Sequence, residues 1–173
     1  MSNKLYYTVF KTGWGWMSIL ASKAGLLAVT LPQITRQQTL DALRGQTQRA
    51  IFSPNLFNDL TEKFHRYFTG GKTNFNEKLD FSRATAFQRQ VWEATRLIPY
   101  GETRSYGWVA MQINKPQAAR AVGQALGKNP FLLIVPCHRV IAMNGGLGGF
   151  SCGLEMKLSL LELEKSSSNK RVC

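Results

Sequence analysis

Short apolar runs separated by glycine-containing turns form the first part of the chain. Residues 5–10, 16–20 and 25–31 are rich in β-branched and aromatic side chains, and the turn segments 12–15 and 22–25 lie between them. Strands of this length joined by such turns usually pair with their neighbours in sequence. The pattern therefore predicts a small antiparallel meander.

Two helical patterns follow the meander. A weak one covers residues 37–49, and a firmer one covers residues 54–68. Ser53 is placed to cap the second helix, Pro54 suits its first turn, and Gly70 suits its end. The apolar stripe of this helix, which we expect to pack on the sheet, consists of Leu56, Phe57, Leu60, Phe64, Tyr67 and Phe68.

The second half of the chain has a helical pattern of hydrophobic positions. Helices are predicted over residues 86–98, 106–113 and 117–126, and Ser105 is placed to cap the second of them. A tight polar turn separates the helices over 106–113 and 117–126. Two short helices joined in this way have the outline of a helix-turn-helix.

A glycine-rich loop over residues 144–149 precedes the last predicted helix, which covers residues 154–165. Such a loop either brings backbone groups close to a flat ligand or is a plain connector. In the last helix we expect Leu154, Leu158 and Leu161 to face the core. Glu164 is expected to lean toward the buried side more than Glu162 does.

The apolar run 131–135 leads directly into a proline, a cysteine, a histidine and an arginine. The run predicts a buried strand or core segment, which Pro136 ends because it cannot donate a backbone hydrogen bond. Cys137 then lies where a rigid core meets an opening, and a nearby base or positive charge favours the reactive thiolate. A free cysteine beside apolar residues is, however, more often an inert small hydrophobe than a reactive thiol.

The net charge of the 173-residue chain is +12, which favours a polyanionic partner, with nucleic acid ahead of acidic membrane. No acidic residue occurs between Glu102 and Glu155, a stretch of 52 residues that contains Arg104, Lys115, Arg120, Lys128 and Arg139. This distribution indicates a surface that lies against phosphate groups. A generally basic, thermally robust protein is the alternative interpretation.

The helix predicted over residues 117–126 has an unusual face. Gln117, Arg120 and Gln124 fall together at helical spacing, and several alanines surround them. Small side chains let a helix approach a groove closely, and one long arginine can then reach past it. Alanine is also simply the best helix former, so the face alone does not establish DNA binding.

Composition excludes several classes of protein. No apolar run approaches the ~20 residues of a membrane span, and the N-terminus lacks a secretory pattern. We therefore expect a protein that is cytoplasmic, or nuclear if eukaryotic, with no membrane partner. Three cysteines without a Cys-x-x-Cys pair argue against a disulfide framework and a structural zinc site. His65 is expected to be a surface or packing residue, and no metal is predicted.

The residues around Cys137 resemble the active-site signature of a known family. Five segments of the chain follow the order and spacing of motifs in the O6-alkylguanine-DNA alkyltransferases. They are Pro-Cys-His-Arg-Val at 136–140, Ile-Pro-Tyr-Gly-Glu-Thr-Arg-Ser-Tyr at 98–106, Ala-Ala-Arg-Ala-Val-Gly at 118–123, Gly-Lys-Asn-Pro at 127–130 and Leu-Leu-Glu-Leu-Glu at 160–164. These alkyltransferases are also called methylated-DNA–protein-cysteine methyltransferases. The likeness covers essentially the whole second half of the chain.

The resemblance implies a DNA repair reaction without a cofactor. The family transfers an alkyl group irreversibly from O6 of guanine, or also from O4 of thymine, in double-stranded DNA to a cysteine of the protein itself, once per molecule. Carried over by position, Cys137 is the acceptor, His138 is the base that takes its proton, Glu164 stabilises the imidazolium, and Asn129 orders the turn. Tyr106 helps rotate the nucleotide out of the duplex and hydrogen-bonds the guanine.

Further roles follow from the same resemblance. Arg120 fills the space left by the rotated nucleotide, and the remaining DNA contacts are assigned to Gln117, Ala119, Ala121 and Gly123. The substrate-binding residues are Val140, Phe150 and Ser151. The protein is expected to act as a monomer, with cooperative binding to DNA left open.

Two residues depart from the family pattern. Phe150 stands where many members have tyrosine, so stacking on a base is retained and a hydroxyl is lost. Cys152 replaces a usual glycine beside the pocket, where its side chain can narrow the pocket or become oxidised. We interpret Cys152 as inert.

The expected architecture is α+β, in two domains. Residues 1–80 form a structural domain with a small antiparallel sheet and helices, and residues 81–165 form a mainly helical domain with the helix-turn-helix and the reactive cysteine. Residues 166–173 form a polar tail, expected to be disordered.

Three rival functions explain fewer of these features. A non-catalytic lesion-recognition relative carries tryptophan at the cysteine position, so Cys137 argues against it. A helix-turn-helix regulator would explain the charge but not the Cys-His pair followed by a late glutamate. A thiol hydrolase would explain that pair but not the 52 residues without a carboxylate.

Overall fold

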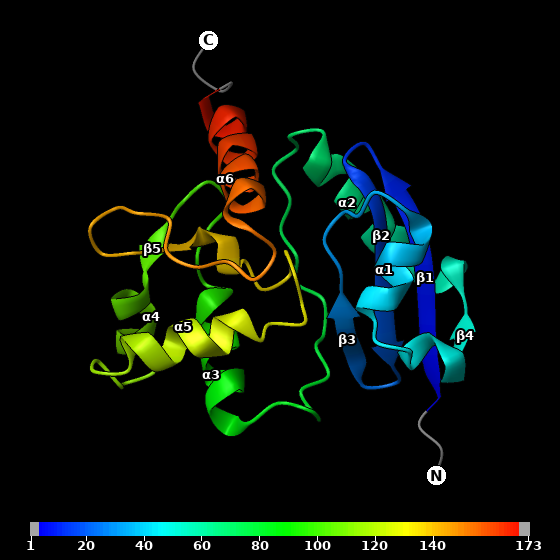
Figure 1. The fold of residues 1–173 in the computed structure, drawn as a ribbon, viewed down its shortest axis with the longest axis horizontal. Coiled ribbons are helices and arrows are strands. Elements are labelled where there is room, and N and C mark those ends of the chain that lie inside the picture. The colour runs from blue at the N-terminus through cyan, green and yellow to red at the C-terminus, as the bar shows by residue number, and fades with distance from the viewer. Residues whose placement is uncertain (1–3, 170–173) are drawn as a thin grey trace. The chain divides into compact units, whose positions relative to one another are not determined.

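The structure, a computed structural model, describes residues 4–169 (Figure 1). The described chain divides into two compact units. The N-terminal unit comprises the residues up to Ser82 together with Pro130–Ile134, and the C-terminal unit comprises Arg83–Asn129 and the residues from Val135 onward. Each unit is described by itself below.

A four-stranded sheet with the order β3-β2-β1-β4 forms the centre of the N-terminal unit. Strands β1 (Leu5–Thr12), β2 (Gly15–Ser22) and β3 (Gly25–Val29) are antiparallel neighbours, as predicted. Strand β4 (Ala50–Phe52) pairs in parallel with β1, so the sheet is mixed. This strand was not predicted, because three residues are too short to show the alternation of a strand.

The predicted helix over residues 37–49 is interrupted. Helix α1 (Arg36–Ala42) begins at a capping box formed by Thr35 and Gln38, and the 3₁₀ helix η1 (Gln46–Arg49) follows separately. Between them Arg44 and Gly45 have φ values of 51° and 70°, a left-handed conformation that an α-helix cannot continue through.

The second predicted helix is present as a 3₁₀ turn, η2 (Pro54–Phe57), followed by α2 (Asn58–Phe68). Ser53 makes no side-chain capping hydrogen bond, and Leu56 is 61% exposed, so both of these predictions were wrong. The 3₁₀ turn rotates Leu56 away from the face that α2 packs on the sheet. The other five residues of the predicted stripe are buried, and Gly70 follows the helix with φ 85°.

The segment Pro130–Ile134 adds to the core of the N-terminal unit. The amide of Val29 donates to the carbonyl of Pro130 over 2.8 Å, and Phe131 packs edge-on against Phe81. A turn at Leu133, with φ 70°, prevents a regular strand, so the segment is a buried core element with isolated bridges.

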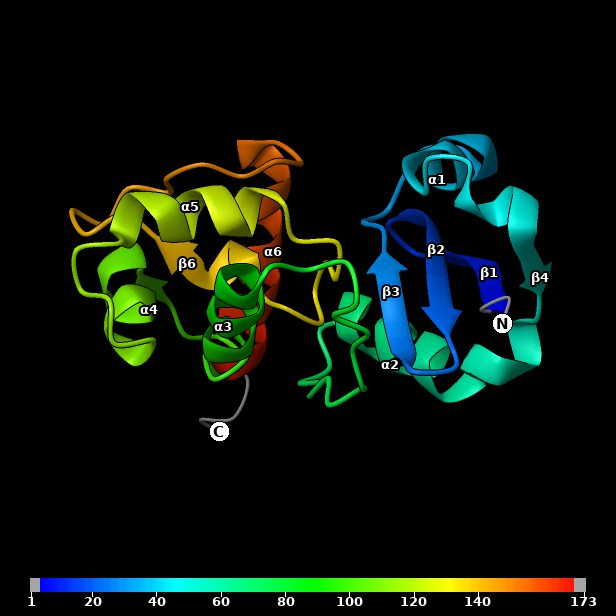
Figure 2. The same ribbon diagram turned by 90° about the horizontal axis from the view of Figure 1, so that it is seen from below.

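The C-terminal unit is mainly helical (Figure 2). Its elements are α3 (Ala86–Thr95), β5 (Arg104–Ser105), α4 (Tyr106–Gln112), α5 (Ala119–Gly127), the 3₁₀ helix η3 (Cys137–Arg139), β6 (Val140–Ile141) and α6 (Leu154–Asn169). Strands β5 and β6 pair in parallel.

Helices α4 and α5 form the predicted helix-turn-helix. The hydroxyl of Ser105 accepts a hydrogen bond from the amide of Trp108 and so caps α4, as predicted. Helix α5 begins at Ala119, two residues later than predicted, so Gln117 lies in the preceding turn and does not share a helix face with Arg120. The chain leaves α4 through Asn114, whose φ of 56° redirects it into that turn.

Helix α6 presents a different face to the core from the predicted one. Leu154 and Leu158 are 49% and 44% exposed. In contrast, the exposed fractions of Lys157, Leu160 and Glu164 are only 0%, 0% and 1%. The leucine pattern was misleading because both buried charged groups have partners inside the unit. The helix also continues to Asn169, past the predicted end at residue 165, and residues 170–173 lie outside the described part of the chain.

Two findings bear on function and apply to residues 4–169. None of their helices is both long and apolar enough to cross a membrane. Within the same residues, no three His, Cys, Asp or Glu side chains are grouped closely enough to hold a metal ion.

Candidate active site and DNA-binding face

Cys137 is the first residue of η3 and is only 6% exposed. Its amide donates to the carbonyl of Val135 over 2.8 Å, which closes a tight turn around Pro136. The side chain of Asn129 donates to the same carbonyl over 3.0 Å and to Cys137 Sγ over 3.2 Å. The amide group of Asn129 therefore holds the turn and the sulfur in one arrangement.

The pKa of Cys137 is raised to about 11, because burial disfavours the thiolate. The hydrogen bond from Asn129 and the charge of Lys157 act in the opposite direction but are weaker. At about pH 7 only about one molecule in ten thousand carries a thiolate. The basic neighbours of Cys137 therefore do not create a permanently ionised cysteine, and a base must take the proton during the reaction.

A buried charge cluster lies next to this cysteine in sequence. Glu164 accepts hydrogen bonds from His138 Nε2 over 2.7 Å and from Arg139 Nε and Nη2 over 2.9 Å each. The amide of Gly101 also donates to Glu164, over 2.9 Å, and Arg139 Nη1 donates to the carbonyl of Ile98 over 2.8 Å. The carboxylate therefore connects η3, α6 and the turn before β5.

The charges in this cluster set the protonation of His138. Burial alone would raise the pKa of Glu164, but the hydrogen bonds and charges of His138 and Arg139 outweigh burial and hold it well below its usual range. Burial lowers the pKa of His138, and Glu164 opposes that shift. His138 is therefore neutral at about pH 7, and because its Nε2–H points to the carboxylate, its Nδ1 carries the lone pair.

A cavity of about 440 Å³ opens at Cys137. Helix α5 forms one wall, and the loop at residues 149–151 forms another. The hydroxyl of Tyr106 donates to the carbonyl of Gly149 over 3.3 Å and joins the start of α4 to this loop. The lining residues are Tyr106, Ala119, Arg120, Gly123, Gln124, Leu126, Gly127, Cys137, Gly149, Phe150 and Ser151.

Close packing of the loop against Tyr106 depends on one glycine. Gly148 has φ 69°, and a Cβ atom there would lie 2.7 Å from the Tyr106 hydroxyl. Any larger residue at this position would force either the loop or the Tyr106 side chain to shift. The loop therefore has a defined position at the mouth of the cavity.

Lys157 holds the other side of this loop and was not predicted as a site residue. Its Nζ donates to the carbonyls of Val140, Leu147 and Gly149 over 2.6, 2.5 and 3.2 Å. Burial lowers the pKa of Lys157 to about 8, and attraction to Cys137 opposes the shift. One signal was available, because Lys157 shares a helix face with Leu160 and Glu164 at i, i+3 and i+7.

The predicted site residues separate into three groups. Seven of them line the cavity: Tyr106, Ala119, Arg120, Gly123, Cys137, Phe150 and Ser151. Asn129, His138 and Glu164 form the buried groups beside Cys137. Val140, Ala121 and Gln117 are not among the residues that line the cavity.

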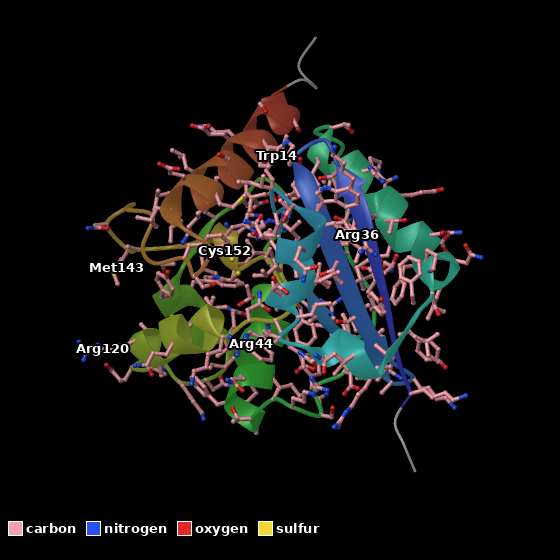
Figure 3. The ribbon with its side chains drawn as sticks, turned by 45° about the vertical axis from the view of Figure 1, so that its right-hand side comes forward. Trp14, Arg36, Arg44, Arg120, Met143 and Cys152 are labelled. Atoms are coloured by element: carbon pink, nitrogen blue, oxygen red, sulfur yellow. The ribbon has the colours of Figure 1, made fainter. Side chains whose placement is uncertain are left out.

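The last group lies outside the cavity for identifiable reasons. Val140 is buried, and its carbonyl accepts from Lys157 over 2.6 Å, so that carbonyl already has one donor. Ala121 is exposed on α5, and Gln117 precedes the helix. Arg120 is exposed, and Figure 3 shows its side chain directed outward from α5.

Cys152 is exposed and does not line the cavity, although its neighbour Ser151 does (Figure 3). The hydroxyl of Ser151 lies 3.8 Å from Cys152 Sγ. Burial raises the pKa of Cys152, so its thiol is largely protonated at about pH 7.

Comparison with known proteins identifies the family. Residues 86–166 match the family described as 6-O-methylguanine DNA methyltransferase, DNA binding domain, and residues 5–81 match 6-O-methylguanine DNA methyltransferase, ribonuclease-like domain. A methylated-DNA–protein-cysteine methyltransferase of Methanosarcina acetivorans is 38% identical over 162 residues, which cover 94% of this chain and 99% of that protein. The chain belongs to the methylated-DNA–protein-cysteine methyltransferase family.

Other members of this family are also similar. The Mycobacterium tuberculosis protein of the same name is 53% identical over 113 residues, covering 65% of this chain and 68% of that protein. The crystal structure of Mycobacterium tuberculosis OGT in complex with DNA has a TM-score of 0.78 and 40% identity, with 94% of each chain covered. The resemblance found in the sequence is therefore confirmed.

Family membership also confirms the architecture predicted from the sequence. An α+β chain with a sheet-containing N-terminal part and a helical C-terminal part corresponds to the ribonuclease-like and DNA-binding matches. The cavity and the buried charge cluster lie within residues 86–166, the range of the DNA-binding match.

Proposed function

We propose that this protein repairs double-stranded DNA by moving the alkyl group of O6-alkylguanine to Cys137 Sγ. The observation that carries the proposal is the position of Cys137, which lines a cavity of about 440 Å³ and is followed directly by the buried His138. The cavity lies beside α5 of a helix-turn-helix. Its volume is within the range of ligand sites and suits one nucleobase.

The first step is removal of the thiol proton. The proton of Cys137 passes to Nδ1 of His138, through a water molecule, and the imidazolium is stabilised by Glu164, 2.7 Å from Nε2. Arg139 keeps the carboxylate ionised, so the imidazolium always finds a negative partner. Asn129 then donates to the new thiolate, to which it already lies within 3.2 Å. Cys137, His138 and Glu164 thus act as nucleophile, base and orienting carboxylate, as in a catalytic triad, but for a single displacement.

The second step forms one bond and breaks one. The thiolate attacks the alkyl carbon in line with its bond to O6, the carbon–sulfur bond forms, and the carbon–oxygen bond breaks. The electron pair of that bond leaves with guanine, which takes a proton in place of the alkyl group. The hydroxyl of Tyr106, which lines the cavity, exchanges its bond to the Gly149 carbonyl for one to guanine and so makes guanine a better leaving group. The products are guanine and a thioether, so the thiol is not regenerated.

Entry of the base requires it to leave the duplex, because O6 is out of reach within the base stack. Arg120 is exposed on α5 and also lines the cavity, so its position suits a side chain that occupies the vacated space. Phe150 offers an aromatic face within the cavity for stacking on the base. The absence of carboxylates from residues 103–154 favours close approach of the phosphates.

The two domains predicted from the sequence have different proposed roles. The C-terminal domain, residues 81–165, carries DNA binding and alkyl acceptance, and residues 1–80 have a structural role. One copy of the chain supplies every group used in the steps above, so the proposal is of a monomeric protein.

The test is intact-protein mass after incubation with a duplex that contains one O6-methylguanine. The expected result is a single gain of about 14 Da, one methyl replacing one proton, located on Cys137. Cys152→Ser, which removes the exposed thiol, should show the same gain, and Cys137→Ser should show none. Tight binding of the lesion duplex without any gain in mass would refute the transfer and leave lesion recognition as the function.

A further inference from the structure

Met143 has an unusual exposure for a large apolar side chain. It is 88% exposed, in the turn that follows β6, and none of the large apolar side chains described in the C-terminal unit is more exposed. Residues 145–149 of the same loop are four glycines and one leucine, so few other side chains project there. An isolated exposed methionine is unremarkable by itself. Two further features distinguish Met143: the hydrogen bonds that hold its turn and the location of that turn in the C-terminal unit.

The turn that carries Met143 is held by hydrogen bonds on both sides. The amide of Ala142 donates to the carbonyl of Gly146 over 2.8 Å, and the amide of Gly145 donates to the carbonyl of Ala142 over 3.0 Å. The side chain of Asn144 accepts from the amide of Gly146 over 3.1 Å. Beyond the turn, Lys157 binds the carbonyl of Leu147. The backbone therefore presents Met143 to solvent from a defined position.

The location of the turn relates it to the DNA-binding face. In Figures 1 and 2 the loop after β6 extends to the same side of the C-terminal unit as the N-terminal part of α5. Figure 3 shows the side chains of Arg120 and Met143 at the same edge of that unit, both directed away from the ribbon. Both belong to the stretch from Glu102 to Glu155 that has no acidic residue between its ends.

We propose that Met143 is an apolar contact to duplex DNA, placed against the sugars or base faces beside the nucleotide that enters the cavity. This inference rests on the proposed function, since it requires the face around Arg120 to meet the duplex. An unbranched, flexible thioether adapts to surfaces of different shape and makes no directed hydrogen bond. It therefore suits a repair protein that must bind lesions in any sequence. Apolar side chains, methionine among them, are used in this way against base steps.

The experiment measures equilibrium binding to a short unmodified duplex over a range of salt concentrations. Met143→Gln keeps the length of the side chain but removes its apolar end, and Met143→Leu keeps the apolar character. Ile34, which is 87% exposed in the N-terminal unit and outside the proposed DNA-binding domain, provides the matched control Ile34→Gln. Thermal unfolding of each variant shows whether it is folded, and substitutions at such exposed positions are expected to leave stability unchanged.

Met143→Gln is expected to weaken binding by about three- to tenfold, as partial burial of one such side chain predicts. The slope of log K against log salt should stay at the wild-type value, because no phosphate contact is lost. Met143→Leu and Ile34→Gln should bind as the wild type does. Unchanged binding by Met143→Gln, an equal loss in Ile34→Gln, or a shallower salt slope would each overturn the inference.

This result is separable from the proposed function. If the wild type gains mass on Cys137 and Met143→Gln binds DNA normally, only the role of Met143 fails. If the wild type does not bind duplex DNA at all, the proposed function fails first.

Discussion

Replacement of Glu164 by glutamine is the most informative perturbation of the buried charge cluster. Glu164 is 1% exposed and accepts four hydrogen bonds, from His138, from two nitrogens of Arg139 and from the amide of Gly101. Glutamine has nearly the same shape but no charge, and its amide nitrogen cannot accept. The substitution leaves Arg139, which is 6% exposed, without its counter-charge.

The expected loss of stability follows from this geometry. Breaking a buried ion pair by removing one partner costs about 3–5 kcal/mol, because the remaining charge is buried and uncompensated. For a chain of this size, each kcal/mol lowers the melting temperature by about 2–4 °C. We therefore expect Glu164→Gln to melt at least about 6 °C below the wild type at about pH 7. Glu162→Gln, on the exposed side of the same helix, should change stability by no more than about 0.5 kcal/mol.

The difference between Glu164→Gln and the wild type should depend on pH with a definite sign. The folded pKa of Glu164 lies well below the ordinary value of 4.5, so its carboxylate contributes stability that is complete above that pH. Below it, the unfolded chain takes up a proton that the folded chain does not. The contribution then shrinks by about 1.4 kcal/mol for each unit of pH. The penalty of Glu164→Gln should therefore be smaller at about pH 3 than at about pH 7.

The assay is thermal and urea unfolding of the wild type, Glu164→Gln and Glu162→Gln across this pH range, followed by circular dichroism. Equal losses in the two variants would refute the reasoning, as would a Glu164→Gln penalty that stays constant as the pH falls. Alkyl transfer by the folded Glu164→Gln variant should also be slower. Glu164 is the group that raises the pKa of His138, so the histidine becomes a poorer proton acceptor without it.

Three further predictions concern the cysteine, the loop and a helix cap. Because burial raises the pKa of Cys137 to about 11, iodoacetamide labelling of the peptide that contains Cys137 should rise about tenfold per pH unit between about pH 7 and pH 10 in a variant with Cys152→Ser and Cys173→Ser. A plateau near neutral pH, seen by mass spectrometry of that peptide, would contradict this. Lys157→Met removes the donor to three carbonyls, so residues 142–150 should be cleaved faster in limited proteolysis and alkyl transfer should slow. Cleavage at the wild-type rate would show that other contacts hold the loop. Ser105→Ala removes the cap of α4 and should cost about 1 kcal/mol in urea unfolding, and a loss near zero would mean that the cap is dispensable.

Local patterns in the sequence determined much of this protein. The three strands of the meander, the cap at Ser105 and the helix-turn-helix depend on side chains and backbone preferences within a few residues, so spacing predicts them. The Pro-Cys-His-Arg-Val motif, together with the order of the other motifs, led to the family that the comparisons confirm. The role of each site residue in the reaction stays a prediction.

Tertiary structure decided the features that depend on distant partners. Helix α6 turns Lys157 and Glu164 inward and leaves Leu154 exposed, the reverse of what its leucine pattern predicts. A buried charge is tolerated only where the fold supplies acceptors or an opposite charge, and here those come from residues 8 to 63 positions away in sequence.

The same dependence applies to the chemistry of Cys137. Its neighbours in sequence include two basic side chains, which suggests a low pKa, but Glu164 engages both of them and burial raises the thiol pKa instead. Strand β4 is a similar case, because three residues form a strand only where β1 offers an open edge. The sequence by itself determined which residues are present and which local elements they form. Only the tertiary structure decided which charges meet, because pairing and burial are properties of segments brought together from far apart in the chain.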